Sequence, residues 1–238
     1  MRKAILSDKG GREVNEDAVG RLRNSDIYCF ALADGLGGHG GGDIASQLAV
    51  STVLQCFKTQ ADIAEDMMEA YFEAAQHAVN EKSEEEPKLQ GMRTTLVTLL
   101  TDGERAIWMH CGDSRLYRLK KHLIQEITDD HSVAFASFLA GDIDYDEIRN
   151  SPDQNKLIRT IGGNSKSRPD ISEAVKVGRN TSFLLCSDGF WEYVDEDHIE
   201  STRKKASSPR DWLIAMEREI KRNAPPDADN YSAIAVYI

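Results

Sequence analysis

Two kinds of apolar pattern divide this chain. Continuous apolar runs, which are typical of strands buried on both faces, cover residues 27–33, 94–100, 106–111, 116–119, 182–186 and 231–238. Apolar residues recur every three or four positions over 45–56, 63–78 and 213–220, which predicts three helices. The third helix has a start signal, with Ser208 as N-cap and Pro209 in the first helical position. The pattern predicts a mixed chain of strands and long helices.

The order of these elements favours an α+β fold. Asp102-Gly103 lies between two apolar runs and predicts a hairpin, because this dipeptide tolerates positive φ. Hairpin-linked strands with long helices between them indicate a largely antiparallel sheet with helices packed outside. Residues 128–163 alternate polar loops with short helical pieces around Phe138-Leu139 and Leu157-Ile158, which predicts a mobile excursion over one face. No linker divides the chain, so residues 1–238 are expected to form one domain.

Composition narrows the possible partners and the compartment. A net charge of −11 over 238 residues gives a nucleic acid no electrostatic help, whereas clustered carboxylates would attract divalent cations. No apolar stretch is long enough for a transmembrane helix, and the N-terminus lacks the apolar core of a signal peptide. The cysteines are widely spaced and fall in apolar segments, as expected of buried free thiols in a reducing compartment: Cys29, Cys56, Cys111 and Cys186. We therefore expect a cytoplasmic protein.

The chain is organised around the stretch from Ile27 to Asp43. An apolar run ends in Asp34, a glycine tract follows, and then an amphipathic segment begins, which predicts strand, tight loop and helix. The tract also matches the dinucleotide fingerprint G-x-G-x-x-G. Asp34 would repel a pyrophosphate, however, and no acidic residue follows at about 20 residues. A metal ligand or catalytic acid is the better interpretation of Asp34, with a dinucleotide-binding oxidoreductase as the weaker alternative.

Several acidic residues repeat this placement at the ends of apolar strands: Asp34, Asp113, Asp188 and Asp229, with the pair Glu16-Asp17 in an early polar loop. Asp is common at strand ends because it favours turns, so any one of them alone could be structural. The whole set predicts a site for hard divalent cations, which prefer oxygen ligands. No His/Cys spacing suits zinc, so magnesium or manganese fits better. Two such ions can share a water and deprotonate it for in-line attack on phosphorus.

Six short motifs in register carry a family resemblance. They are Arg12-x-x-Asn15-Glu16-Asp17, Ala33-Asp34-Gly35-x-Gly37-Gly38-His39, Cys111-Gly112-Asp113-Ser114-Arg115, Thr128-x-Asp130-His131, Ser187-Asp188-Gly189 and Asp229-Asn230. Together they resemble the metal-dependent serine/threonine protein phosphatases of the protein phosphatase 2C type, in their compact bacterial form. The resemblance implies a central sandwich of two antiparallel β-sheets flanked by α-helices, with metals bound in a channel at one end and a variable flap at about residues 132–163.

The resemblance also implies a ligand set. Asp34 matches the carboxylate that bridges both metals, and the Gly35 carbonyl and Glu16 would complete the second site. Asp188 and Asp229 match the other ligands of the first site. Asp113, together with Asp188, matches the position linked to a third, weaker metal in bacterial relatives.

Other matching residues are implied to act around the metals. Arg12 resembles the phosphate-binding arginine of the family, and Asp17 would orient metal-bound waters. Asn230, Ser114 and Arg115 would brace the loops. Many eukaryotic members have a histidine directly after Asp-Gly, where this chain has Leu36; His39 follows three residues later, as a general acid or as a brace of the glycine loop.

The expected function is hydrolysis of phosphoserine and phosphothreonine in proteins by a dinuclear Mg²⁺ or Mn²⁺ centre, without a phosphoenzyme. The alternative on the same fold is a catalytically weak module that binds phosphoproteins. The implied partners are phosphorylated proteins, as substrates of a partner serine/threonine kinase, and a monomer is expected.

Overall fold

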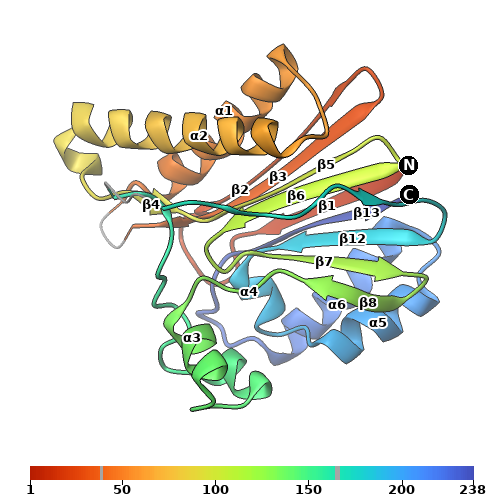
Figure 1. Cartoon of the computed structure of the whole chain (residues 1–238). Coiled ribbons are helices and arrows are strands. Elements are labelled where there is room, and N and C mark those ends of the chain that lie inside the picture. The colour runs from red at the N-terminus through yellow and green to blue at the C-terminus, as the bar shows by residue number, and fades with distance from the viewer. Residues whose placement is uncertain (38–39, 164–166) are drawn as a thin grey trace.

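The computed structural model describes residues 1–37, 40–163 and 167–238. Two antiparallel sheets face each other in it, with helices on both outer faces (Figure 1). The predicted sandwich is therefore confirmed. All the strand pairs in these residues are antiparallel, in keeping with the hairpin-rich order of the sequence.

The first sheet has the strand order β1-β13-β12-β7-β8. Its strands are β1 (Arg2–Asp8), β7 (Arg115–Lys120), β8 (Leu123–Ile127), β12 (Thr181–Cys186) and β13 (Tyr231–Tyr237). Helices α5 (Glu196–Lys205) and α6 (Pro209–Asn223) cover its outer face, where Trp191, Trp212 and Met216 are completely buried. Ser208 accepts a hydrogen bond from the Asp211 amide, so the predicted N-cap of α6 is confirmed.

The second sheet has the order β10-β6-β5-β3-β4-β9, with β2 beside β3 and β11 beside β6. Its strands are β2 (Asp17–Asn24), β3 (Ile27–Leu36), β4 (Arg93–Thr94), β5 (Leu96–Thr101), β6 (Arg105–Cys111), β9 (Ile161–Gly162), β10 (Asp170–Ile171) and β11 (Val175–Lys176). Helices α1 (Gly42–Thr59) and α2 (Glu65–Glu85) cover its outer face. A short 3₁₀ turn, η1 (Pro87–Leu89), follows α2.

The core between the sheets is built from apolar side chains of both of them. Phe30 and Leu99 of the second sheet meet Phe183, Ile234 and other residues of the first, all fully buried. Complete burial of such side chains contributes about 1.5–3 kcal/mol each. The sandwich is thus a rigid support for the strand ends that emerge from it.

Most of residues 132–163 form a lobe at the bottom of Figure 1, from which the chain returns to the second sheet at β9. The lobe holds α3 (Val133–Ala140) and the 3₁₀ helix η2 (Tyr145–Asn150), which pack a small cluster of their own around Phe135 and Ile148. The helical piece predicted around Phe138-Leu139 is confirmed. The one predicted around Leu157-Ile158 is wrong, because Leu157 forms a β-bridge with Ser132 instead.

Two other expectations need correction. β3 does not end at Asp34 but continues through Gly35 and Leu36, because β4 pairs with these two residues. Helix α2 runs on to Glu85, beyond residue 78 where the apolar pattern ends, so the polar residues that follow the pattern belong to the helix. The cysteines are free, as expected, with Cys56 partly exposed and the rest buried.

Candidate metal centre

The acidic strand ends meet in one pocket of about 390 Å³ at one end of the sandwich. Its walls contain all the residues proposed from the sequence as metal ligands or phosphate contact: Arg12, Glu16, Asp34, Gly35, Asp113, Asp188 and Asp229. These residues come from segments up to about two hundred positions apart in the chain. The sequence-based grouping of these residues is therefore reproduced in space. We call this site the acid pocket.

Both sheets contribute to the acid pocket. Asp34 and Gly35 lie near the end of β3, and Asp113 follows β6, so these come from the second sheet. Asp188 begins the short helix α4 (Asp188–Trp191) directly after β12, and Asp229 precedes β13, so these come from the first. The pocket is thus fixed by the packing of the two sheets against each other.

Asp34 is held through its backbone by two threonines. Its amide donates to Thr95 Oγ1 at 2.9 Å, and its carbonyl accepts from Thr94 Oγ1 at 2.8 Å and from the Thr95 amide at 2.9 Å. Thr95 Oγ1 also lies 2.7 Å from Ser114 Oγ. This pair joins the Asp34 strand to the Asp113 loop, and Ser114 therefore has the bracing position expected for it. The two threonines were not singled out from the sequence.

Glycine is required where β3 passes the start of α1. A Cβ on Gly35 would lie 2.1 Å from the Gly42 carbonyl oxygen, and one on Gly42 would lie 2.6 Å from Glu16 Oε2. The Gly35 amide donates to the Glu16 carbonyl at 3.1 Å. The missing side chains therefore let the Glu16, Gly35 and Gly42 segments meet at the edge of the pocket.

The carboxylates of the acid pocket repel one another. Burial, followed by the charge of Asp188, raises the pKa of Asp34 well above its usual range. Burial and the charge of Asp188 act in the same direction on the pKa of Asp113, and burial also raises the pKa of Asp188. Negative charge is crowded here beyond what the neighbouring protein groups offset.

Asp17 lies behind this pocket rather than in its wall. Its Oδ2 accepts from Ser187 Oγ at 2.8 Å, whereas its buried Oδ1 has no hydrogen-bond partner. Burial raises the pKa of Asp17 to about 7. An orphaned carboxylate oxygen at this depth fits a partner such as a metal-bound water, which is the kind of role the resemblance implies.

The donor set fits hard cations. The groups available are carboxylates and a backbone carbonyl, which are the ligands that Mg²⁺ and Mn²⁺ prefer. Cations would also offset the mutual repulsion that raises the carboxylate pKa values. Oxygen donors, crowded charge and the unpaired Asp17 oxygen all agree with a site for divalent metals.

Arg12 lies at the rim, where its Nη2 is 3.0 Å from Asp229 Oδ2. Its side chain is 55% exposed, so it can reach a group that enters from solvent. Asn230 fixes the loop beside it: its Oδ1 accepts from the Glu16 amide at 2.7 Å and its Nδ2 donates to the carbonyls of Lys9 and Val14. The predicted bracing by Asn230 is therefore confirmed.

Two residues of the flap also line the acid pocket, Asn155 and Leu157. No sequence signal marked them, because the flap lacks a motif. His39 lies outside the described residues, so its role stays a prediction, although Gly37 and Gly40 on either side line the pocket.

Arg115 is buried beneath the Asp113 loop, as the bracing role expected for it requires. It forms two hydrogen bonds with Asp130, at 2.7 and 2.8 Å, and its guanidinium lies 3.6 Å from the centre of the Trp191 ring. The Trp191 indole donates to the Asp113 carbonyl at 2.9 Å. This indole contact was not anticipated from the sequence.

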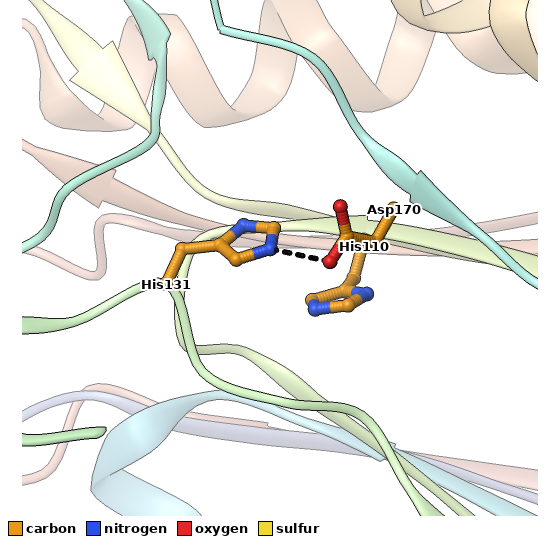
Figure 2. A group of neighbouring side chains, drawn as sticks. All are labelled: His110, His131 and Asp170. Carbon is orange, nitrogen blue, oxygen red and sulfur yellow. Dashed lines mark hydrogen bonds and ion pairs between the residues drawn. The ribbon is translucent and has the colours of Figure 1, made fainter. Parts of the chain in front are cut away.

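A second group of titratable side chains lies outside the acid pocket. His110, His131 and Asp170 offer one nitrogen or oxygen each within 4.8 Å of one another (Figure 2). His110 and His131 stack with ring centres 4.6 Å apart. We call this group the histidine cluster. No spacing in the sequence pointed to it, because the three residues come from β6, a loop and β10.

Comparison with known proteins identifies the family. The family model described as protein phosphatase 2C matches residues 9–222. The chain belongs to the protein phosphatase 2C family. A curated member, the serine/threonine phosphatase stp of Listeria monocytogenes serotype 4b, is 31% identical over 99% of this chain and 95% of its own.

Solved structures of family members share the whole fold. The serine/threonine phosphatase Stp1 of Staphylococcus aureus superposes with a TM-score of 0.91 at 26% identity, over 99% of this chain and 94% of its own. The catalytic domain of the phosphatase PstP, in complex with two manganese ions, gives a TM-score of 0.83 at 28% identity, over 100% of this chain and 98% of its own. The protein phosphatase 2C family is metal-dependent. In the described part of this chain, no helix is both long and apolar enough to cross a membrane.

Proposed function

We propose that this chain is a metal-dependent serine/threonine protein phosphatase that acts through the acid pocket. The observation that carries the proposal is the meeting of Glu16, Asp34, Asp113, Asp188 and Asp229 in one pocket, with pKa values of the buried carboxyls raised by burial and mutual repulsion. The named relatives support it, since they are serine/threonine phosphatases that align over nearly the whole chain.

Specific residues would hold the metals. Asp34 would bridge two ions, with Asp188 and Asp229 on one side, and Glu16 and the Gly35 carbonyl on the other. Asp113, with Asp188, would hold a third and weaker ion. When bound, such ions lower the pKa of a water and offset the charge of the phosphate. Whether Mn²⁺ or Mg²⁺ serves is set by supply as much as by these ligands; the manganese in the PstP structure supports Mn²⁺ for the assay.

Other groups of the chain would bind the phosphoryl group, orient water and hold Asp34 in place. Arg12 is exposed at the rim and would grip two phosphoryl oxygens with its planar guanidinium. The unpaired Oδ1 of Asp17 would accept a hydrogen bond from a water and so orient that water toward the acid pocket. The Asp34 carboxylate is fixed through its backbone by Thr94 and Thr95, so little reorganisation is needed when substrate enters.

The substrates in this proposal are proteins phosphorylated on serine or threonine by a partner kinase, and the enzyme works as a cytoplasmic monomer of one domain. The flap, at about residues 132–163, would contact the substrate, since Asn155 and Leu157 already line the acid pocket. His39 would brace the glycine loop beside Asp34, with a general-acid role as the competing possibility.

Release of phosphate from a phosphoserine peptide tests the proposal. We expect release with Mn²⁺ and none with excess EDTA. A phosphoprotein-binding module would bind the phosphopeptide without releasing phosphate, and that result would contradict the proposed activity.

A further inference from the structure

The histidine cluster has the residue types of a metal site, but its hydrogen bonds use the groups that a metal would need. The Gly112 amide lies 3.2 Å from His131 Nδ1. A backbone amide only donates, so Nδ1 must accept and the proton of neutral His131 must sit on Nε2. Nε2 lies 3.1 Å from Asp170 Oδ2 and donates to it. Arg159 Nη1 lies 3.3 Å from the same nitrogen, but because both groups then carry protons this contact is not a hydrogen bond. His131 therefore has no free lone pair for a cation.

The polar groups of His110 and Asp170 also have hydrogen-bond partners. His110 Nε2 lies 2.7 Å from the Asp129 carbonyl oxygen and must donate to it. Asp170 accepts from His131 with one oxygen and from Arg159 Nη1, at 2.6 Å, with the other. The Arg159 guanidinium supplies the positive charge that a cation would bring. Among the ring nitrogens of the cluster, only His110 Nδ1 has no hydrogen bond to the described residues, and both oxygens of Asp170 already accept from charged or ring N–H groups.

His131 holds both polar groups of Gly112, the residue before Asp113. Its ring accepts from the Gly112 amide, and its own amide donates to the Gly112 carbonyl at 3.0 Å. Gly112 has φ +106°, and a Cβ there would lie 2.6 Å from Thr95 Cγ2. The turn that aims Asp113 into the acid pocket is therefore strained for any other residue and is fixed by this double contact.

His131 is bonded to the flap as well. Its carbonyl accepts from the Ile158 amide at 2.8 Å, and the next pairing, from the Val133 amide to the Lys156 carbonyl, is also 2.8 Å. Arg159 then ties the same segment to Asp170. The flap segment that brings Asn155 and Leu157 to the pocket is thus joined to the Asp113 turn through one residue.

We propose that His131 is a positioning residue that sets Asp113 in the acid pocket relative to the flap. The inference rests on the proposed function only in assigning Asp113 to a metal. The ring acts as a neutral Nε2–H tautomer, which joins the Gly112 amide on one side to Asp170 on the other. Burial lowers the pKa of His131 to about 4, so this neutral form persists at physiological pH.

Two substitutions separate its two contacts. The Asn side chain can place an acceptor near the Nδ1 position, so His131→Asn should keep the contact with Gly112 and lose the one with Asp170. The longer His131→Gln reaches toward Asp170 and should lose the Gly112 contact. His77→Gln, at an exposed position of α2, is the matched control.

The readout is manganese binding by calorimetry, with turnover measured beside it. We expect His131→Gln to weaken the weaker manganese site and lower kcat about fivefold to tenfold, the effect of one neutral hydrogen bond. KM for the phosphopeptide should stay constant, and His131→Asn should stay near wild type. Equal losses in both variants, in step with their Tm values, would overturn the proposal.

Nitrogen-15 NMR of the wild-type imidazoles tests the same inference without a substitution. It should report an Nε2-protonated, Nδ1-unprotonated His131. The opposite tautomer, or zinc binding that shifts both His110 and His131, would also overturn it. A wild-type protein that bound manganese but released no phosphate would contradict the proposed function. The calorimetric and NMR comparisons would still decide whether His131 positions Asp113.

Discussion

The acid pocket and the histidine cluster lie on either side of the Gly112-Asp113 turn, and they handle charge in opposite ways. In the acid pocket, buried carboxylates repel one another, and behind it Asp17 keeps an oxygen without a hydrogen-bond partner. In the histidine cluster, Asp170 receives both a histidine N–H and an arginine N–H, and its pKa falls below the usual range. In the first group Arg12 pairs only with Asp229 at the rim, and the pKa values of the buried carboxyls stay raised, whereas the carboxylate of the second group is already paired with an arginine.

This difference separates a metal site from a group that merely resembles one. His and Asp side chains close together meet the donor requirement of many metals. Their hydrogen bonds decide whether the lone pairs are available. The comparison therefore predicts metal binding at the carboxylates and none at the histidines, and each experiment below tests one part of that contrast.

The largest effect is expected at Asp34. Asp34→Asn keeps the shape of the side chain but removes the charge placed to bridge two cations. We expect phosphatase activity to fall by about three orders of magnitude or more, since metal ions supply several kcal/mol of transition-state stabilisation. Steady-state kinetics at saturating Mn²⁺ measures this, and turnover near wild type would remove Asp34 from the metal centre.

The second largest effect is expected at Arg12. Arg12→Ala removes the exposed guanidinium at the rim, so KM for a phosphopeptide should rise by roughly 10- to 100-fold, the worth of a charged hydrogen-bond pair. Affinity for Mn²⁺ should change little. Arg12→Lys should recover only part of the loss, because an ammonium group lacks the planar fork. Unchanged kinetics in the alanine variant would make Arg12 an ordinary surface residue.

Asp113 is expected to give a smaller effect than Asp34. Asp113→Ala should leave the two tight manganese sites intact, lower kcat about tenfold, and raise the Mn²⁺ concentration needed for half-maximal rate. Calorimetry checks the stoichiometry. Loss of the tight sites would instead assign Asp113 to the central pair.

The sequence predicted the acid pocket better than its surroundings. The carboxylates were found because strand ends and turn residues leave local signals that do not depend on the fold. Asn155 and Leu157 were missed because a flap without a motif is placed only by tertiary contacts. The extension of β3 past Asp34 was missed for a similar reason: pairing with β4 overrides the glycines.

The histidine cluster shows the same limit more sharply. His131 was noticed only as part of a motif, and neither His110 nor Asp170 stood out. Their meeting depends on the antiparallel register that puts Asp170 opposite His110 across β10 and β6. Register between segments sixty residues apart is a property of the assembled sheet rather than of either segment.

The smallest of the expected effects concerns the pH dependence of the free energy of unfolding. Burial raises the pKa of Asp17 to about 7, from an unfolded value of 3.8, so the folded protein binds more protons between these values. In EDTA, the free energy of unfolding should therefore fall as pH rises through this window and level off above about pH 7.

Manganese should reverse that trend, because it binds the ionised carboxylates in the folded state only. Tm should thus rise with Mn²⁺ more at high pH than at low pH, by about 2–4 °C for each kcal/mol in a protein of this size. Thermal scans from about pH 5 to about pH 8, with EDTA or Mn²⁺, measure the gap. A gap that stays constant with pH would mean that ionisation of these carboxylates is not linked to metal binding.

The most direct test of the central claim is a calorimetric titration of Mn²⁺ into the EDTA-stripped protein, with one variant from each group. We expect two tight sites in wild type, their loss in Asp34→Asn, and their retention in His110→Asn, because the histidine cluster holds no metal. Tight sites that survive Asp34→Asn, or that disappear in His110→Asn, would contradict the assignment of the metal centre to the acid pocket.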